Sequence, residues 1–213
     1  MQPSFALFFV TAVAYLLGSL SFAVIVSRLV GLSDPRGYGS GNPGATNVLR
    51  SGNKAAAALT LLLDAFKGWL AVFVVARWGA AWQLGPDALA LAGLAAFIGH
   101  LYPVFFKFKG GKGVATAAGV LLGWAWPVGL LVLGVWILTV AVLRYSSLAA
   151  LVAAVAAAPC YLLGLVTGWW PVSQPVVLAA MVLSALLIWR HRGNIKRLLA
   201  GQEPRVGQKK AAP

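Results

Sequence analysis

The feature that most constrains this chain is a succession of apolar stretches long enough to cross a lipid bilayer. A membrane-spanning helix needs about 20 mostly apolar residues. Five stretches meet this requirement: Phe5–Val26, Ala55–Ala76, Ala88–Phe106, Leu148–Val166 and Val176–Trp189. Only 10% of the 213 residues are charged, against about a quarter in a soluble domain. The sequence therefore predicts an all-α, multi-pass integral membrane protein with a single membrane domain, 1–213.

A sixth apolar stretch, Val114–Leu143, is long for one membrane helix and short for two. It contains Gly123–Pro127, where proline disfavours a continuous helix and two tryptophans favour the membrane–water interface. We therefore expect a tight hairpin at the membrane surface, with a short helix before it. Two helices in this stretch bring the predicted number of spans to about seven.

Basic residues indicate how the chain is threaded through the membrane. There are 17 Lys and Arg against four acidic residues, for a formal charge of +13. Seven spans with the N-terminus outside leave only Arg77 outside, whereas six would force the basic tail, 190–213, outside against the positive-inside tendency. We therefore predict an outside N-terminus and a cytoplasmic C-terminus. Because the bases lie between apolar stretches, acidic substrates and membrane lipids are expected partners, and nucleic acid is not.

The longest polar loop, 31–53, contains a segment dense in glycine and amide side chains, Gly39–Arg50. Glycines let a backbone approach a ligand and expose its N–H groups, and arginine has a planar guanidinium suited to phosphate. Asn47 and Arg50 are spaced to share one helical face. An ordinary turn-rich loop would account for any one of these residues but not for so dense a run. Its neutral hydrogen-bonding residues are Ser40, Asn42, Thr46 and Asn47.

The second polar segment, 99–116, contains His100 and then a glycine-rich run that leads into an apolar helix. The run contains Gly110, Gly111, Lys112 and Gly113. Free N–H groups at a helix N-terminus, together with a lysine, can bind an anion. The Walker A pattern is absent because Gly113 follows Lys112, so a nucleotide triphosphatase is disfavoured. A flexible basic turn is the alternative, in which His100 is an interfacial residue rather than a catalyst.

The third polar segment, His191–Glu203, lies in the basic tail. In a helix, His191 and Asn194 would face the same side and could orient or polarise a hydroxyl. Glu203 is surrounded by bases and is expected to be a structural ion-pair partner. A basic juxtamembrane tail would explain the Arg and Lys residues of this segment but not the His/Asn pair.

Two ionisable residues, Asp64 and Lys67, lie inside an expected span. Charged groups at membrane depth normally pair with one another or line a polar cavity. A mutual ion pair and a role in substrate binding therefore both remain open. Two histidines, one cysteine and four scattered acids form no metal-ligand set, and no acid is obviously placed to complete a Ser-His-Asp triad.

These segments resemble the three motifs of the bacterial acyl-phosphate:glycerol-3-phosphate 1-acyltransferases, the PlsY family. The matches are Gly39–Arg50 with G-S-G-N-x-G-A-T-N-x-x-R, Gly99–Thr116 with G-H-x-x-P-V-F-x-x-F-x-G-G-K-G-V-A-T, and His191–Glu203 with H-x-x-N-I-x-R-L-x-x-G-x-E. Asp64–Gly68 also matches the family's D-x-x-K-G. The motifs are long, specific and in the same order, and the similarity covers essentially the whole chain. Pro43 departs from the family pattern and should stiffen its loop without abolishing binding.

The resemblance implies transfer of a fatty acyl group from acyl phosphate to the sn-1 hydroxyl of glycerol 3-phosphate. The products would be lysophosphatidic acid and phosphate, at the entry to bacterial phospholipid synthesis. The family uses no acyl-CoA, acyl carrier protein or metal, so no cofactor is expected. The implied location is the bacterial cytoplasmic (inner) membrane, with the active site at the cytoplasmic face.

The resemblance and the residue chemistry together assign roles to single residues. Catalytic roles are expected for Ser40, Arg50, Lys112, His191 and Asn194. Substrate-binding roles are expected for Asn42, Gly44, Thr46, Asn47, Lys67, His100, Gly110, Gly111, Gly113 and Thr116, and structural roles for Asp64 and Glu203. Ser40 is expected to hydrogen-bond the substrate rather than form an acyl-serine, because no base is obviously placed beside it.

The proton acceptor stays open between His191 and a substrate phosphate. A phosphate monoester titrates near pH 6 and histidine at about 6.5, so basicity alone does not choose between them. Two other protein classes also stay open. A transporter for phosphorylated solutes would use basic intramembrane groups but should have internal repeats, and none is evident. A structural or lipid-binding membrane protein would leave the glycine-rich segments without a role.

Overall fold

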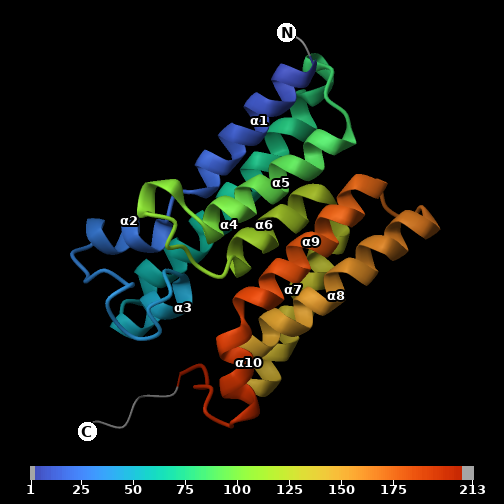
Figure 1. The fold of residues 1–213 in the computed structure, drawn as a ribbon. Helices are drawn as coiled ribbons and strands as arrows, with labels where there is room; N and C mark the ends of the chain where they lie inside the picture. Colours follow the sequence, from blue (N-terminus) through green and yellow to red (C-terminus); the bar gives the residue numbers. More distant parts are fainter. Residues whose placement is uncertain (1–2, 208–213) are drawn as a thin grey trace, which may run out of the picture.

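The computed structural model describes residues 3–207, and every regular element in that part of the chain is helical (Figure 1). The longer helices are α1 (Pro3–Gly18), α4 (Lys54–Trp78), α5 (Pro86–Leu101), α7 (Trp126–Leu143), α8 (Ser146–Thr167) and α9 (Gln174–Arg190). The shorter ones are α2 (Phe22–Leu29), α3 (Ala45–Val48), α6 (Val114–Trp124) and α10 (Arg192–Leu199), with 3₁₀ turns η1 (Leu49–Ser51), η2 (Gly79–Trp82) and η3 (Val104–Phe106). The predicted all-α class is confirmed. The ends of the predicted domain 1–213 and of the predicted tail, including Lys209 and Lys210, lie outside the described residues.

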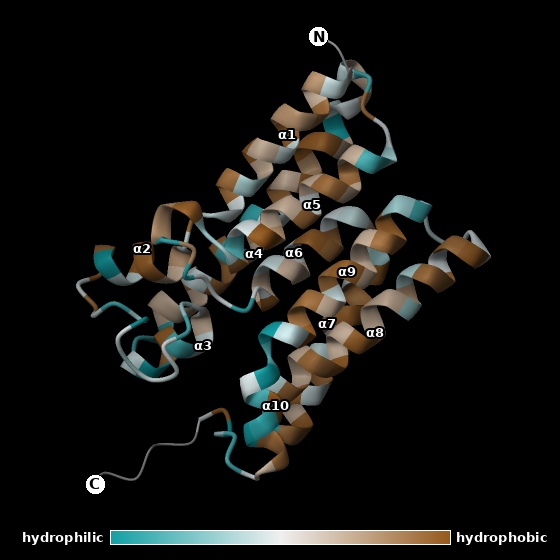
Figure 2. Ribbon diagram, in the orientation of Figure 1, coloured by the Kyte–Doolittle hydropathy of each residue, from teal (hydrophilic) through white to brown (hydrophobic). Residues whose placement is uncertain are grey.

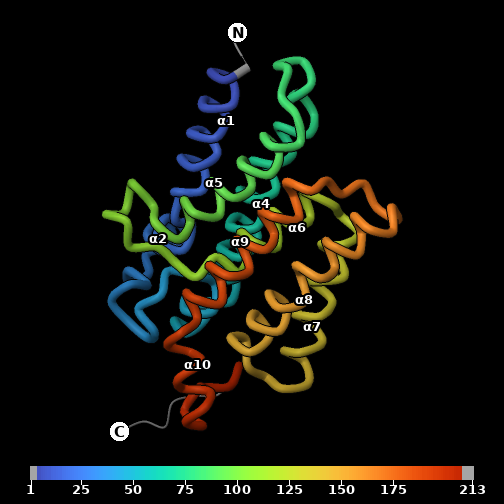
Figure 3. Tube along the Cα trace, turned by 45° about the vertical axis from the view of Figure 1, so that its right-hand side comes forward, coloured from blue at the N-terminus to red at the C-terminus, as the bar shows by residue number. Residues whose placement is uncertain are grey.

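The longer helices and α6 form two groups that pack against each other (Figures 1 and 3). Helices α1, α4, α5 and α6 make up one group, and α7, α8 and α9 make up the other. Contacts of α5 with α9, and of α6 with α7 and α9, join the two groups. The polar segments gather at one end of the bundle, around α2, α3 and α10, as the hydropathy colouring shows (Figure 2).

Four segments are long and apolar enough to cross a membrane: Lys54–Trp82, Pro86–Phe106, Trp126–Leu143 and Ser146–Thr167. Two bent pairs, α1 with α2 (44°) and α9 with α10 (56°), raise the number to six when each is counted as one span. Helix α6, with 11 residues, is the remaining apolar helix. The predicted seven spans require α6 to count as a crossing, so this number and the orientation of the termini stay predictions.

The expected hairpin between α6 and α7 is present. Helix α6 ends at Trp124, Ala125 adopts an extended conformation (φ −155°, ψ 100°), and α7 begins at Trp126. Pro127 lies in the first turn of α7, where its missing N–H breaks no helical hydrogen bond. The predicted first span, Phe5–Val26, is a bent pair rather than one continuous helix, because the chain leaves the helix between Gly18 and Phe22.

A lysine from another helix satisfies the backbone at the break between α1 and α2. The carbonyl of Leu20 accepts a hydrogen bond from Lys67 Nζ of α4 (2.6 Å), while Ser19 Oγ donates to the Tyr15 carbonyl (2.9 Å). A carbonyl freed by a helix break inside an apolar bundle needs such a donor. Hydropathy alone contains no information about this tertiary contact, so the apolar stretch Phe5–Val26 gave no sign of the break.

Glycines allow α4 and α6 to pack with their backbones in contact. A Cβ at Gly119 of α6 would collide with the Ala65 carbonyl of α4, and one at Gly123 would lie 2.8 Å from Val72 Cβ. On α4, Gly68 faces Thr116 in the same way. Small residues at such crossings are typical of membrane helix pairs. This packing places the first residues of α6 against α4.

We predict that Gly119→Ala lowers the stability of the protein although alanine is the better helix former. Overpacking costs about 1–3 kcal/mol, which exceeds the gain of about 0.5–1 kcal/mol from helix propensity. The melting temperature of the purified protein in detergent should therefore fall. Gly134→Ala on α7 is the matched control, because a Cβ at Gly134 meets nothing within 4 Å; equal shifts in both variants would contradict the prediction.

Candidate active site

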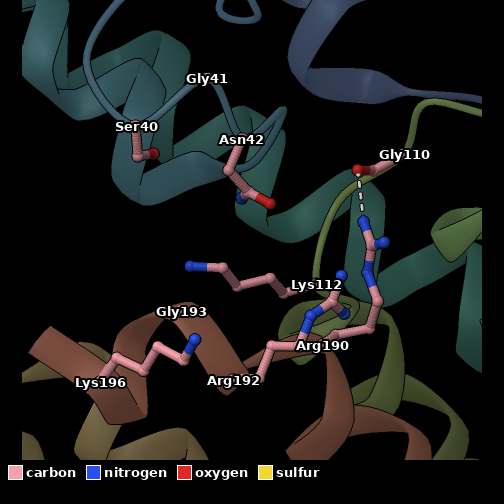
Figure 4. A pocket seen from close by; sticks show the side chains of 9 residues that line it. All are labelled: Ser40, Gly41, Asn42, Gly110, Lys112, Arg190, Arg192, Gly193 and Lys196. Carbon is pink, nitrogen blue, oxygen red and sulfur yellow. Dashed lines mark hydrogen bonds between the residues drawn. The ribbon is translucent and has the colours of Figure 1, made fainter.

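A cavity of about 400 Å³ lies at the polar end of the bundle, where the three polar segments meet (Figure 4). Ser40, Gly41 and Asn42 come from the first segment, Gly110 and Lys112 from the second, and Arg190, Arg192, Gly193 and Lys196 from the end of α9 and from α10. Segments that are far apart in the sequence thus form one cavity. Among residues 3–207, its lining contains four cationic side chains and no carboxylate.

Asn47 holds the first loop in shape. Its Oδ1 accepts hydrogen bonds from the Ser40 N–H (3.0 Å) and from Arg50 Nη1 (3.3 Å). Its Nδ2 donates to the carbonyls of Pro35 (2.6 Å) and Tyr38 (3.1 Å). The Asn47 side chain is buried and bonds only to the loop, so it presents Ser40 and its neighbours to the cavity rather than facing the cavity itself.

Arg190 holds the glycine-rich loop. Its guanidinium donates to the Gly110 carbonyl (3.0 Å) and twice to the Gly111 carbonyl (2.9 and 3.2 Å). It also stacks on the Tyr102 ring at 5.5 Å. The Gly111 N–H donates to the His100 carbonyl (3.2 Å), and a Cβ at Gly111 would collide with the His100 ring. The loop is therefore clamped between α5 and the end of α9, and no larger residue fits at Gly111.

Lys112 projects from this loop into the cavity (Figure 4). The next residue, Gly113, precedes α6 with φ +84°, and a Cβ there would meet Phe97 and Leu101. Burial lowers the pKa of Lys112 to about 8; the Glu203 carboxylate opposes this shift, and Arg197, Arg50 and Arg190 add to it. Lys112 is therefore charged at neutral pH and titrates only slightly above it.

His191 and Asn194 lie behind the cavity wall, on the inner side of the turn from α9 to α10. Both are buried. His191 follows the last residue of α9 and thus lies outside that apolar helix; its Nδ1–H donates to the Leu187 carbonyl (2.8 Å). Burial lowers the pKa of His191 to about 4, and the backbone hydrogen bond offsets only part of this shift. The ring is therefore neutral near pH 7, and Nε2 is left as an acceptor.

Glu203 ties the tail to α8 and α10. Its Oε1 accepts from Ser147 Oγ (2.6 Å) and Asn194 Nδ2 (2.6 Å), and its Oε2 accepts from Arg197 Nε (2.8 Å). Burial raises the pKa of this carboxyl, but these three hydrogen bonds outweigh it and hold the pKa below its usual value. Three residues further on, Val206 exchanges hydrogen bonds with Arg144 in the α7–α8 turn. The tail thereby fixes Asn194 and, with it, the position of α10.

Asp64 and Lys67 form a buried ion pair at 2.7 Å. Lys67 Nζ also contacts His100 Nδ1 (3.0 Å) and the Leu20 carbonyl. Lys67 is therefore surrounded by a carboxylate, a carbonyl and an imidazole nitrogen, all within the protein. Of the two roles left open by the sequence, the structure favours the ion pair, and neither Lys67 nor His100 lines the cavity.

The structure brings some of the predicted residues to the cavity and places others behind it. Ser40, Asn42, Gly110 and Lys112 line it. Thr116 is fully buried and packs against Gly68, and Thr46 is exposed on α3. The predicted residues that do not line it are Gly44, Thr46, Asn47, Arg50, Asp64, Lys67, His100, Gly111, Gly113, Thr116, His191, Asn194 and Glu203.

The sequence interpretation gave no site role to five of the lining residues: Gly41, Arg190, Arg192, Gly193 and Lys196. The three cations among them were attributed to the positive-inside tendency, which explains basic residues at this end of the bundle without giving them a site. One signal was available, because Arg192 and Lys196 are spaced four apart and share a helical face.

This chain is similar to known proteins in both sequence and fold. The family model described as "Glycerol-3-phosphate acyltransferase" matches residues 8–201. The chain belongs to the glycerol-3-phosphate acyltransferase family. A glycerol-3-phosphate acyltransferase of Paraburkholderia phytofirmans is 59% identical over 203 residues, covering 95% of this chain and 92% of that protein. One of Burkholderia pseudomallei is 59% identical over 202 residues, covering 94% and 95%.

Two crystal structures of PlsY (YgiH), an integral membrane glycerol 3-phosphate acyltransferase, have the same fold. The glycerol 3-phosphate form matches with a TM-score of 0.84, and the lysophosphatidic acid form with 0.82. Both are 40% identical in sequence, and each match covers 95% of this chain and 96% of the PlsY chain. As a member of the glycerol-3-phosphate acyltransferase family, this chain is an acyltransferase of phospholipid biosynthesis and a multi-pass integral membrane protein.

We predict that Lys67→Met destabilises this family member more than the double variant Asp64→Asn/Lys67→Met does. The single variant leaves a carboxylate buried without its counter-ion, which typically costs about 3–5 kcal/mol, whereas the double variant removes both charges. Unfolding of the purified proteins in detergent measures the difference. Equal destabilisation by the two variants would show that Asp64 does not depend on Lys67.

Proposed function

We propose that this acyltransferase takes its acyl group from acyl phosphate and transfers it to the sn-1 hydroxyl of glycerol 3-phosphate. The products are lysophosphatidic acid and inorganic phosphate. The observation that carries the proposal is a single cavity lined by four cations and no carboxylate, at one end of an otherwise apolar helix bundle. Such a cavity suits two phosphate groups held close together while the acyl chain stays among the helices or in the lipid.

Names of relatives support the acceptor and the product. The related PlsY structures are described as a glycerol 3-phosphate form and a lysophosphatidic acid form. Chemistry supports the donor, because an acyl phosphate is an activated mixed anhydride that carries a phosphate group for the cationic cavity. The excess of basic residues at this end supports a cytoplasmic location for the site, in the bacterial inner membrane.

In the proposed reaction, the sn-1 hydroxyl oxygen attacks the acyl carbonyl carbon, and the bond from that carbon to the phosphate oxygen breaks. Lys112 neutralises charge on phosphate, and Arg50 adds a second cation beside the cavity. Ser40 and Asn42, which lie on the first loop, form hydrogen bonds with the substrate. The donor is already activated, so positioning and charge stabilisation carry most of the catalysis.

Between the two possible proton acceptors, we infer that a substrate phosphate takes the hydroxyl proton. A phosphate monoester has a pKa near 6, whereas burial lowers the pKa of His191 to about 4, which makes the imidazole the weaker base. His191 is buried behind the cavity wall, so its role is to support the turn from α9 to α10 rather than to take the proton. Asn194, which donates to Glu203, is buried behind the same wall and helps to fix the position of α10.

The direct test is turnover by the purified protein in detergent or lipid, with glycerol 3-phosphate and palmitoyl phosphate. Phosphate and lysophosphatidic acid should appear together, and Lys112→Ala and Arg50→Ala should both lose activity. Palmitoyl-CoA, given in parallel, should not serve as donor. Turnover with palmitoyl-CoA alone would refute the donor, and uptake of glycerol 3-phosphate into vesicles without turnover would point to a transporter.

We predict that substrate affinity falls as the pH rises through about 8, because Lys112 loses its charge there. The phosphate groups do not counteract this effect, since they are already dianionic above a pKa near 6. The KM for a phosphate-bearing substrate should therefore rise between pH 7 and pH 9 in the wild type. Lys112→Arg should flatten the profile, because arginine stays charged; identical profiles for the two proteins would contradict the prediction.

A further inference from the structure

We propose that Arg192 and Lys196 form a separate phosphate subsite on α10, opposite Ser40 and Asn42 across the cavity. This inference rests on the proposed function and extends it, because two phosphate-bearing substrates need two places for a phosphate group. The ligand class is a phosphate dianion attached to one of the two substrates. Neither residue has a place in the motif-based assignment of the site.

The first argument is that no carboxylate side chain within residues 3–207 neutralises this pair. The sequence contains four acids, and three are paired elsewhere: Asp34 with Arg36, Asp64 with Lys67, and Glu203 with Arg197. The fourth, Asp87, lies in the first turn of α5 and lines a different pocket, together with Ser4 of α1. Arg192 and Lys196 therefore leave a local excess of positive charge in the cavity.

The second argument is that Arg192 and Lys196 keep their N–H donors free for a ligand, whereas the other two cations of the cavity belong to the glycine-rich loop or are bonded to it. The Arg190 donors are directed at the carbonyls of Gly110 and Gly111, and Lys112 belongs to the glycine-rich loop. Arg192 stacks on the Trp189 ring at 4.6 Å, which steadies the guanidinium without using its N–H donors. Within residues 3–207, neither Arg192 nor Lys196 has a hydrogen-bond acceptor or an ion-pair partner in the protein.

The third argument is geometric. Arg192 and Lys196 are one helical turn apart on α10, so their side chains can reach one anion. Figure 4 shows both extending from α10 into the cavity, with Ser40 and Asn42 on the opposite side and Lys112 entering between them. Like charges at this spacing repel each other in an unliganded helix, and a phosphate between them removes that repulsion.

Charge balance agrees with two phosphate positions in the cavity. Each phosphate monoester carries about −1.5 to −2 at pH 7. Lys112 with the glycine-rich loop suits one such group, which leaves the positive charge of Arg192 and Lys196 for the second. Basic residues that only set the orientation of the chain in the membrane have no need to line a cavity. Arg28 and Lys54 lie at the same end of the bundle and do not line the cavity, whereas Arg192 and Lys196 do.

The test compares Arg192→Gln/Lys196→Gln with the wild type, varying each substrate while the other is saturating. We expect the KM for one substrate to rise about tenfold or more, because charge-assisted hydrogen bonds to phosphate are lost, while kcat changes little. A rise for glycerol 3-phosphate assigns the subsite to the acceptor, and a rise for palmitoyl phosphate assigns it to the donor. Arg28→Gln/Lys54→Gln is the matched control, which removes the same two charge types outside the cavity and should leave both KM values unchanged.

A binding measurement separates this proposal from the proposed reaction. Inorganic phosphate should raise the melting temperature of the wild-type protein, because a ligand that binds only the folded state stabilises it, and the rise should be smaller in Arg192→Gln/Lys196→Gln. This readout needs no turnover, so it holds even if the acyl-transfer assay fails. Ordinary exposed charges would change these quantities little. If both KM values and the phosphate-induced shift of Arg192→Gln/Lys196→Gln stay within about twofold of the wild-type values, the subsite is refuted.

If the double variant does not fold, the charge-preserving exchange Arg192→Lys/Lys196→Arg replaces it. Arginine and lysine bind phosphate with different geometry, so the exchange should change the KM of the same single substrate. An unchanged KM for both substrates in a folded exchange variant would also refute the subsite.

Discussion

A buried ion pair, Asp64–Lys67, connects the parts of this fold that the active-site loops depend on. Lys67 bonds to its own helix through Asp64, to the break between α1 and α2 through the Leu20 carbonyl, and to α5 through His100. Charges in an apolar bundle are tolerated only when such partners are complete. The pair therefore specifies how α1, α4 and α5 sit together, and a change at any of the three contacts affects the others.

Backbone hydrogen bonds connect this ion-pair network to the cavity. The His100 carbonyl accepts a hydrogen bond from the Gly111 N–H. The Gly110 and Gly111 carbonyls accept hydrogen bonds from Arg190, which is the last residue of α9 and is followed by α10. On the other side of α10, Glu203 holds Asn194 and Arg197. Arg190 is the one lining side chain that supports a loop in this way; Asn47 and Glu203 support the other segments from behind the cavity, and Arg192 and Lys196 have no bonds to the described protein. Such an arrangement suits a site whose cations are meant for ligands.

The sequence predicted the fold well where local chemistry decides it. Pro127 and its flanking tryptophans placed the turn between α6 and α7, and the apolar stretches gave α4, α5, α8 and α9 to within a few residues. The break at Leu20 was missed because it depends on a lysine 47 positions away. Arg192 and Lys196 were missed for a different reason: a basic residue near a membrane has an ordinary explanation in topology, so its charge alone does not distinguish a site.

The sequence by itself determined the all-α membrane class, the family, and the three segments that meet at one end of the bundle, because these follow from apolar length, charge distribution and long motifs. Only the tertiary structure decided which side chains face the cavity. Asn47, Lys67 and His100 carry ligand-binding chemistry in the sequence, yet their polar atoms bond to neighbouring parts of the fold. The physical reason is that a buried polar group must be satisfied by its surroundings, and those surroundings come from helices distant in the chain.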